Sequence, residues 1–159
     1  MKASMRALTC AVATAALAAL APALPAAAAA PAQAARHPVT ISGIYYNSPG
    51  SDRGGNASLN HEWVRLHNTT GHAISLTGWT LRDAARHVYR FGTYRLRAHG
   101  SVKIHTGHGR NTQRNRYWRH SWYIWNNTGD TATLKTAGGT VRARCHYSDS
   151  SENRVFTSC

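Results

Sequence analysis

The segment from Arg110 to Trp125 holds the side chains whose types and spacing best suit binding chemistry. The candidate contacts are Arg110, Arg114, Arg116, Trp118 and Arg119. Guanidinium groups bind phosphates and carboxylates through paired hydrogen bonds, and aromatic rings stack on bases or sugar faces. The pattern therefore predicts a surface for a negatively charged polymer. The alternative is a loop whose Trp118 folds back on the core, followed by a buried strand over residues 122–125.

Histidines could support metal chemistry, and two of them, His105 and His108, lie three residues apart. Imidazole binds zinc and copper, but no Cys, Asp or Glu lies near in sequence to complete a site. Three further histidines, His61, His67 and His120, could approach in space. We expect no metal site and no cofactor, and a metal-dependent hydrolase built on histidines is the alternative.

Other motifs for catalysis are absent from the sequence. No Gly-x-Ser-x-Gly motif occurs, and six acids offer few partners that could orient a histidine. Glu62 leads an expected strand without a second carboxylate beside it, which favours a structural role over acid catalysis. A calcium site would need more carboxylates than Asp52, the single one in the loop over residues 52–60. We therefore expect a protein that is not an enzyme.

The first 34 residues have the pattern of a secretory signal peptide. Lys2 and Arg6 give a positive start, an alanine-rich apolar stretch follows, and Ala32-Gln33-Ala34 fits a cleavage site. A transmembrane anchor is the alternative, but it would need a more apolar run than one made mostly of alanine. The sequence thus predicts a signal peptide over residues 1–34 and one exported, extracellular domain over residues 35–159.

The expected mature domain is strongly basic. Loss of Lys2 and Arg6 leaves 17 basic residues against six acids, a net charge of +11 before any histidine is protonated. All ten histidines remain, so acidification to about pH 6 would raise the charge further. A field of this sign attracts anionic polymers, although the same charge also keeps a protein soluble.

Two cysteines, Cys145 and Cys159, lie outside the leader. An even pair in an exported chain indicates a disulfide, which would close a 15-residue loop and tie the C-terminal tail to the last strand. The alternative is one buried thiol and one free thiol near the terminus. Zinc is disfavoured because no Cys-x-x-Cys spacing is present.

Alternation of apolar and polar residues predicts an all-β domain. It is clearest over residues 61–68, where Val64 and Leu66 point to one face and Arg65 and His67 to the other. Further strands are expected over residues 39–46, 74–81, 87–91, 101–106, 122–126, 131–136 and 141–145, with a loop over residues 47–60. Short strands at this spacing predict a β-sandwich of two sheets.

The order of these pieces resembles the lamin tail domain, an immunoglobulin-like β-sandwich. The segments that carry the resemblance are Glu62–Asn68, Ile74–Asp83, Tyr89–Phe91, Val102–Gly107, Trp125–Asp130 and Ala132–Val141. The sequence shows neither the coiled-coil rod nor the prenylation box of nuclear lamins, so the exported bacterial form of the domain is more similar. That resemblance implies the immunoglobulin-like fold and a role in adhesion or targeting.

Charge and resemblance together predict a secreted, non-enzymatic binding module, monomeric and without a membrane span. The expected partner is an anionic polymer, either extracellular DNA or a cell-wall polyanion, or another exported protein. The alternative to polyanion binding is protein–protein recognition through a sheet edge or an aromatic patch.

Overall fold

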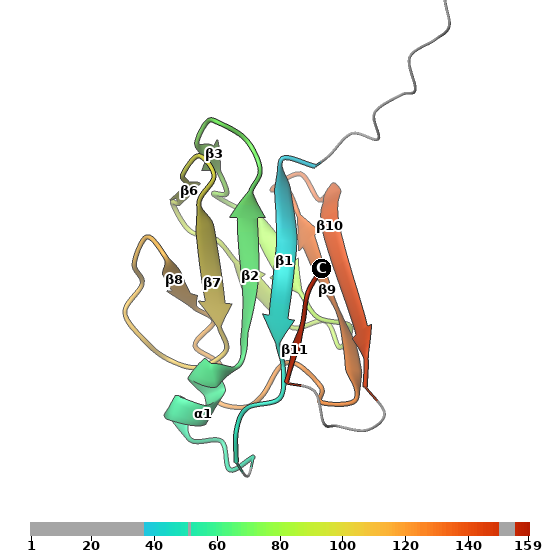
Figure 1. Ribbon diagram of the computed structural model, residues 1–159. Coiled ribbons are helices and arrows are strands. Elements are labelled where there is room, and N and C mark those ends of the chain that lie inside the picture. The colour runs from blue at the N-terminus through green and yellow to red at the C-terminus, as the bar shows by residue number, and fades with distance from the viewer. Residues whose placement is uncertain (1–36, 51, 150–154) are drawn as a thin grey trace, which may run out of the picture. The chain divides into compact units, whose positions relative to one another are not determined.

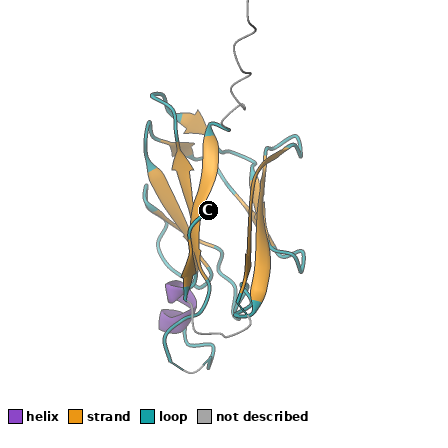
Figure 2. Cartoon of the chain, turned by 45° about the vertical axis from the view of Figure 1, so that its right-hand side comes forward, coloured by secondary structure: helices purple, strands orange, loops and turns teal. Residues whose placement is uncertain are grey.

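The computed structural model describes residues 37–50, 52–149 and 155–159 (Figure 1). The expected signal peptide over residues 1–34 lies outside these described residues. Two sheets face each other, and the apolar side chains of their inner faces form the core (Figure 2). This arrangement confirms the predicted all-β sandwich.

The first sheet has five strands in the order β11-β1-β2-β7-β8. Their bounds are β1 Val39–Tyr45, β2 Trp63–Asn68, β7 Ser101–His105, β8 Asn115–Tyr117 and β11 Phe156–Thr157. Neighbouring strands are antiparallel except β7 and β8, which run parallel. The chain thus brings its last described strand back beside its first.

The second sheet has four antiparallel strands in the order β10-β9-β4-β5. Their bounds are β4 Thr80–Arg82, β5 Val88–Arg90, β9 Gly129–Lys135 and β10 Val141–Ser148. A small third sheet pairs β3, Ile74–Ser75, with β6, Arg95–Leu96. The turn at Ala137-Gly138-Gly139 joins β9 to β10, with the amide of Gly139 donating to the carbonyl of Thr136.

Alternation along the strands determines which side chains enter the core. Val64 and Leu66 of β2 are fully buried, whereas Arg65 and His67, which alternate with them, are half-buried on the other face. Ala132 and Leu134 of β9 face them from the opposite sheet in the same core cluster. Burial of every second side chain on one face of each sheet stabilises the sandwich by removing apolar area from water.

A short helix corrects the expected loop over residues 47–60. Helix α1, Asn56–His61, buries Leu59. Its Asn56 and Asn60 lie one turn apart, and both amide groups donate to the carbonyl oxygen of His108. The helix therefore fixes the loop that follows β7. Among the described residues, no helix has the length and apolar character needed to cross a bilayer.

The expected strand over residues 122–126 is also wrong. No strand forms there, and Trp122 leaves 56% of its surface exposed. Ile124 and Trp125 are buried as expected, but their amides donate to the carboxylate of Glu62 and not to a neighbouring strand. The bulky side chains of this segment are typical of a strand. Its backbone amides instead donate to an acid that is distant in the sequence.

A disulfide links the two large sheets. Cys145 lies on β10 of the four-stranded sheet, and Cys159 follows β11 of the five-stranded sheet. The pair is the one that the sequence predicts. It attaches the short β11, whose partners on β1 are Ile44 and Tyr45, to the opposite side of the core.

We expect removal of this disulfide to destabilise the fold. For a closed loop of this length, the chain-entropy model gives about 3 kcal/mol. Urea unfolding of Cys145→Ser/Cys159→Ser beside the oxidised chain measures the difference. Equal midpoints would contradict a stabilising role, and the reduced parent chain serves as the control.

The buried Trp125 and the exposed Trp122 form a matched pair for testing the core. Trp125→Ala removes a ring that is 2% exposed, so we expect a loss of about 3–5 kcal/mol in the free energy of unfolding. Trp122→Ala should change it by no more than about 0.5 kcal/mol. Chemical unfolding measures the free energy of unfolding of both variants. Similar losses in the two would contradict the placement of Trp125 in the core and of Trp122 at the surface.

Candidate functional site

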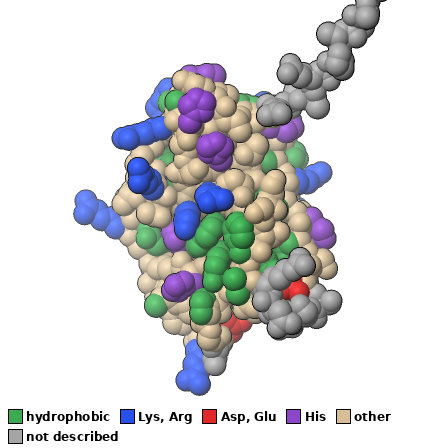
Figure 3. All heavy atoms as spheres, viewed as in Figure 1, with side chains coloured by type: hydrophobic (Ala, Val, Ile, Leu, Met, Phe, Trp, Pro, Cys, Tyr) green, Lys and Arg blue, Asp and Glu red, His purple; other side chains and the backbone are tan. Residues whose placement is uncertain are grey.

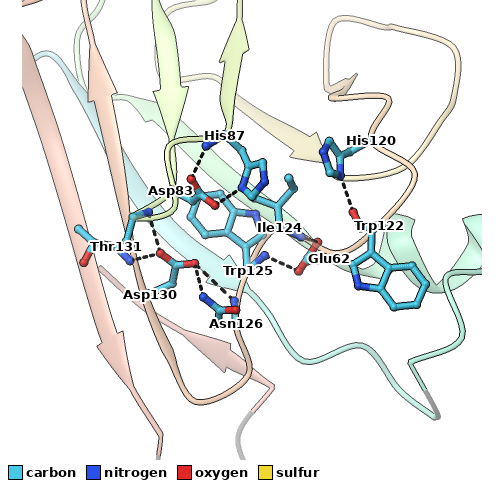
Figure 4. A network of polar contacts seen from close by, with 11 residues as sticks. Glu62, Asp83, His87, His120, Trp122, Ile124, Trp125, Asn126, Asp130 and Thr131 are labelled. Carbon is cyan, nitrogen blue, oxygen red and sulfur yellow. Dashed lines mark hydrogen bonds and ion pairs between the residues drawn. The ribbon is translucent and has the colours of Figure 1, made fainter.

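Buried carboxylates hold the irregular segments of the molecule in place. Glu62, at the start of β2, is fully buried and accepts hydrogen bonds from the amides of Trp125 at 2.7 Å and Ile124 at 3.1 Å (Figure 4). A backbone without a neighbouring strand must find other partners for its amides when it is buried. Glu62 supplies them, which agrees with the structural role that the sequence favours.

Two further acids act in the same way on the loops around β4 and β9. Asp130 accepts the amides of Ala84 at 2.9 Å and Thr131 at 2.6 Å. Asp83 accepts the amide of His87 at 2.7 Å, and its second oxygen lies 2.5 Å from Nδ1 of the same residue. Figure 4 shows Asp83 and Asp130 on one side of Trp125 and Glu62 on the other.

Burial raises the pKa of Glu62 to about 7, although the two amide donors oppose the rise. Between pH 4.5, the ordinary value for this carboxyl group, and about 7, the folded chain holds a proton that the unfolded chain has lost. Protonation therefore favours the folded state below pH 4.5. This contribution is lost as the pH rises through about 7.

Because most of the described acidic side chains are buried, the surface of the domain is cationic. Glu62, Asp83, Asp130 and Asp149 are buried, and Asp52 is the one exposed acid among the described residues. Between described residues, no arginine or lysine forms an ion pair with a carboxylate; the pair that does form joins His87 to Asp83. Figure 3 shows Lys, Arg and His side chains spread over one face with little acid among them.

The structure divides the five predicted contact residues between two places. Arg110 and Arg114 are exposed, and Arg114 lies beside the outer face of the five-stranded sheet. Arg116, half-buried on β8, has its guanidinium 4.2 Å from the ring centre of Tyr94. Its register partner Ile104 faces the core, so Arg116 lies on the inner side of the sheet edge.

Trp118 and Arg119 lie near Arg116 and away from the outer sheet face. Trp118 packs against the core, with its ring centre 5.9 Å from that of Tyr89. Burial raises the pKa of Tyr89, while the nearby charges of Arg116 and Arg119 oppose the rise. Arg119 is exposed. The arginines of this segment therefore lie around the edge of the sheet, and Trp118 attaches the segment to the core.

Two cations on the outer sheet face are not among the contact residues predicted from the sequence. Arg65 of β2 pairs in register with Lys103 of β7, and both line a shallow hollow of about 260 Å³ with Arg114. The ammonium of Lys103 lies 3.9 Å from the ring centre of Trp63. Burial lowers the pKa of Lys103, and the charge of Arg65 adds to the effect. Alternation within each strand predicts that these side chains point outward. Their pairing depends on the register between β2 and β7, which the sequence of a single strand does not show.

The candidate metal-binding histidines make protein contacts. Nδ1 of His105 lies 2.7 Å from the carbonyl oxygen of Asn60, and Nε2 lies 3.0 Å from Oδ1 of Asn115. The backbone of His108 is bonded to Asn56 and Asn60. No group of three His, Cys, Asp or Glu side chains with the geometry for a metal ion occurs within residues 37–50, 52–149 and 155–159.

Comparison with protein families identifies the fold. The model of the Lamin Tail Domain matches residues 32–149. The chain belongs to the lamin tail domain family. This membership confirms the resemblance seen in the sequence and makes the chain an immunoglobulin-like interaction module. A search of curated proteins gave no match.

Glu62→Gln tests how the buried carboxylate supports this lamin tail domain. The amide group cannot ionise, and its NH₂ would face one of the two backbone donors, so we expect a loss of about 1–3 kcal/mol. We also expect the stability advantage of the parent over the variant to shrink by at most about 3 kcal/mol from pH 4.5 to pH 7.

Urea unfolding of both chains at several pH values measures this difference, and it cancels histidine titrations that the two chains share. Asp52→Asn, which removes an exposed acid, is the control for the loss of one charge. A difference that stays constant with pH would contradict the raised pKa of Glu62.

Proposed function

We propose that this lamin tail domain is an exported, non-enzymatic module that binds an anionic polymer such as extracellular DNA or a cell-wall polyanion. The observation that carries the proposal is the division of charge: the described acids lie inside, apart from Asp52, and the cations face solvent. Counterions that condense on a polyanion are released when such a surface binds it, which drives association at low salt.

Several features support the choice of partner and location. The basic residues are mostly arginines, whose planar groups match phosphate and carboxylate geometry. Arg110, Arg114 and Arg119 are exposed, and Arg116 is half-buried on the edge strand β8, so a flexible polymer that wraps this edge could contact cations on both of its sides. Export agrees with the leader pattern and with a disulfide, which persists in oxidising compartments.

Binding of the purified chain to labelled duplex DNA tests the proposal. We expect affinity to fall steeply with salt, with a slope of about −0.9 in log K against log salt for each phosphate contacted. Arg114→Gln/Arg116→Gln/Arg119→Gln should weaken binding and flatten the slope by up to about 2.7. Glutamine retains most of the side-chain length, including at Arg119, whose φ of 66° disfavours many replacements.

The matched control removes three charges from the other sheet, as Arg90→Gln/Lys135→Gln/Arg144→Gln. Equal weakening by both triple variants would show that net charge matters and the sheet edge does not. Heparin and teichoic acid as competitors distinguish DNA from other polyanions. Absence of binding to all three polymers at low salt would overturn the proposal and favour recognition of an exported protein.

A further inference from the structure

Five aromatic side chains lie in a row across the outer face of the five-stranded sheet. Each strand contributes one ring, and register pairs connect them in spatial order. The row, called here the aromatic row, consists of Phe156, Tyr45, Trp63, His105 and Tyr117. These residues come from parts of the sequence more than one hundred positions apart.

The rings of the aromatic row pack in two groups, and the register pair of Trp63 and His105 joins the groups. The ring centres of Tyr45 and Trp63 lie 5.7 Å apart, those of Trp63 and Phe156 lie 5.8 Å apart, and those of His105 and Tyr117 lie 5.1 Å apart. Gly43 makes room for this packing, because a Cβ atom there would meet the ring of Phe156 at 2.6 Å. The row is thus a built feature of the sheet face.

Cations lie directly beside the aromatic row. Arg65 and Lys103 occupy the next outward positions along β2 and β7, and Arg114 joins them at the shared hollow. The strands of this sheet contain no Asp or Glu among their described residues. Figure 3 shows the apolar patch of this face with Lys and Arg side chains at its border.

The outer face of the other sheet differs, although it is also basic. Thr80, Thr131 and Thr133 point outward there beside Arg90 and Arg144. The described outward positions carry the imidazole of His146 but no Phe, Tyr or Trp. A solvent-facing sheet surface is ordinarily polar. Aromatic rings gathered on one of two basic faces therefore require an explanation of their own.

We propose that the aromatic row and its bordering cations bind a single-stranded polynucleotide. Bases would stack on the rings, and phosphates would contact Arg65, Lys103 and Arg114, as in other proteins that combine a stacking surface with a basic track. This inference rests on the proposed polyanion-binding function and names its ligand class and contact face. Four steps between strands span about 19 Å, roughly five or six nucleotides of a stacked strand.

The chemistry of the face favours a single strand over the other anionic polymers. Bases in a duplex are stacked on each other and paired, so their faces are not free to meet a flat row of rings. Teichoic acids and other phosphate-rich wall polymers satisfy the cations but have no planar base to stack. A single strand matches both the rings and the charges.

Fluorescence anisotropy with a labelled oligothymidylate of about 12 nucleotides, beside a duplex of equal length, tests the inference. We expect tighter binding of the single strand. Trp63→Leu and Tyr45→Leu/Phe156→Leu should each weaken single-strand binding by about five-fold to 100-fold and duplex binding far less. Trp122→Leu, an exposed tryptophan outside the row, is the matched control and should leave both affinities unchanged.

Lys103→Gln/Arg65→Gln should lower the salt slope by about 0.7 for each phosphate that the variant no longer neutralises, while the preference for the single strand remains. Circular dichroism and thermal unfolding establish that each variant is folded. If Trp63→Leu proves unfolded, the Tyr45→Leu/Phe156→Leu pair carries the test.

Three results would overturn the inference. Equal binding of single strand and duplex, with no effect of the aromatic variants, would leave polyanion binding intact and remove the aromatic row from it. Binding of teichoic acid or heparin without the single strand would have the same meaning. No binding to any of these polymers would remove both this inference and the proposed function.

Discussion

The fold depends on one buried carboxylate that takes the place of a missing strand. Glu62 receives the amides of Ile124 and Trp125, and this pair of bonds carries the chain across the bottom of the sandwich without a neighbouring strand. Trp125 is thereby held in the core, and Trp118 packs against it with ring centres 6.1 Å apart. Of the arginines that flank Trp118, Arg116 is held by the pairing of β8 with β7, and the amide of Arg119 donates to the carbonyl of Gly107.

The same use of acids explains the electrostatic character of the surface. A carboxylate that satisfies buried amides is withdrawn from solvent and cannot neutralise an exposed arginine. With Glu62, Asp83 and Asp130 all employed inside, the cations outside remain without acidic partners among the described residues. The burial of these acids thus contributes both to the internal hydrogen bonds and to the positive charge of the described surface.

Local patterns in the sequence predict those parts of the fold that depend on local rules. Alternation places Val64 and Leu66 in the core because side chains of a strand point to opposite faces. The family resemblance depends on Glu62 and Asp130, which prove to be the anchors of loops. Residues 122–125 and helix α1 were missed because distant partners, Glu62 and the carbonyl of His108, decide their structure. The cations of the candidate site were partly predicted, since Arg114 was selected, whereas its neighbours Arg65 and Lys103 required cross-strand register.

The short β11 has a consequence for where the protein can act. This strand has two residues and supplies Phe156, the end of the aromatic row, and the disulfide from Cys159 to Cys145 fastens it to the far sheet. With the disulfide reduced, β11 is held by its pairing with Ile44 and Tyr45 of β1 and by the contact of Phe156 with Trp63. Formation of the disulfide adds a covalent link from this end of the row to β10. We therefore expect the Phe156 end of the aromatic row to be held most firmly in an oxidising compartment, where disulfides persist.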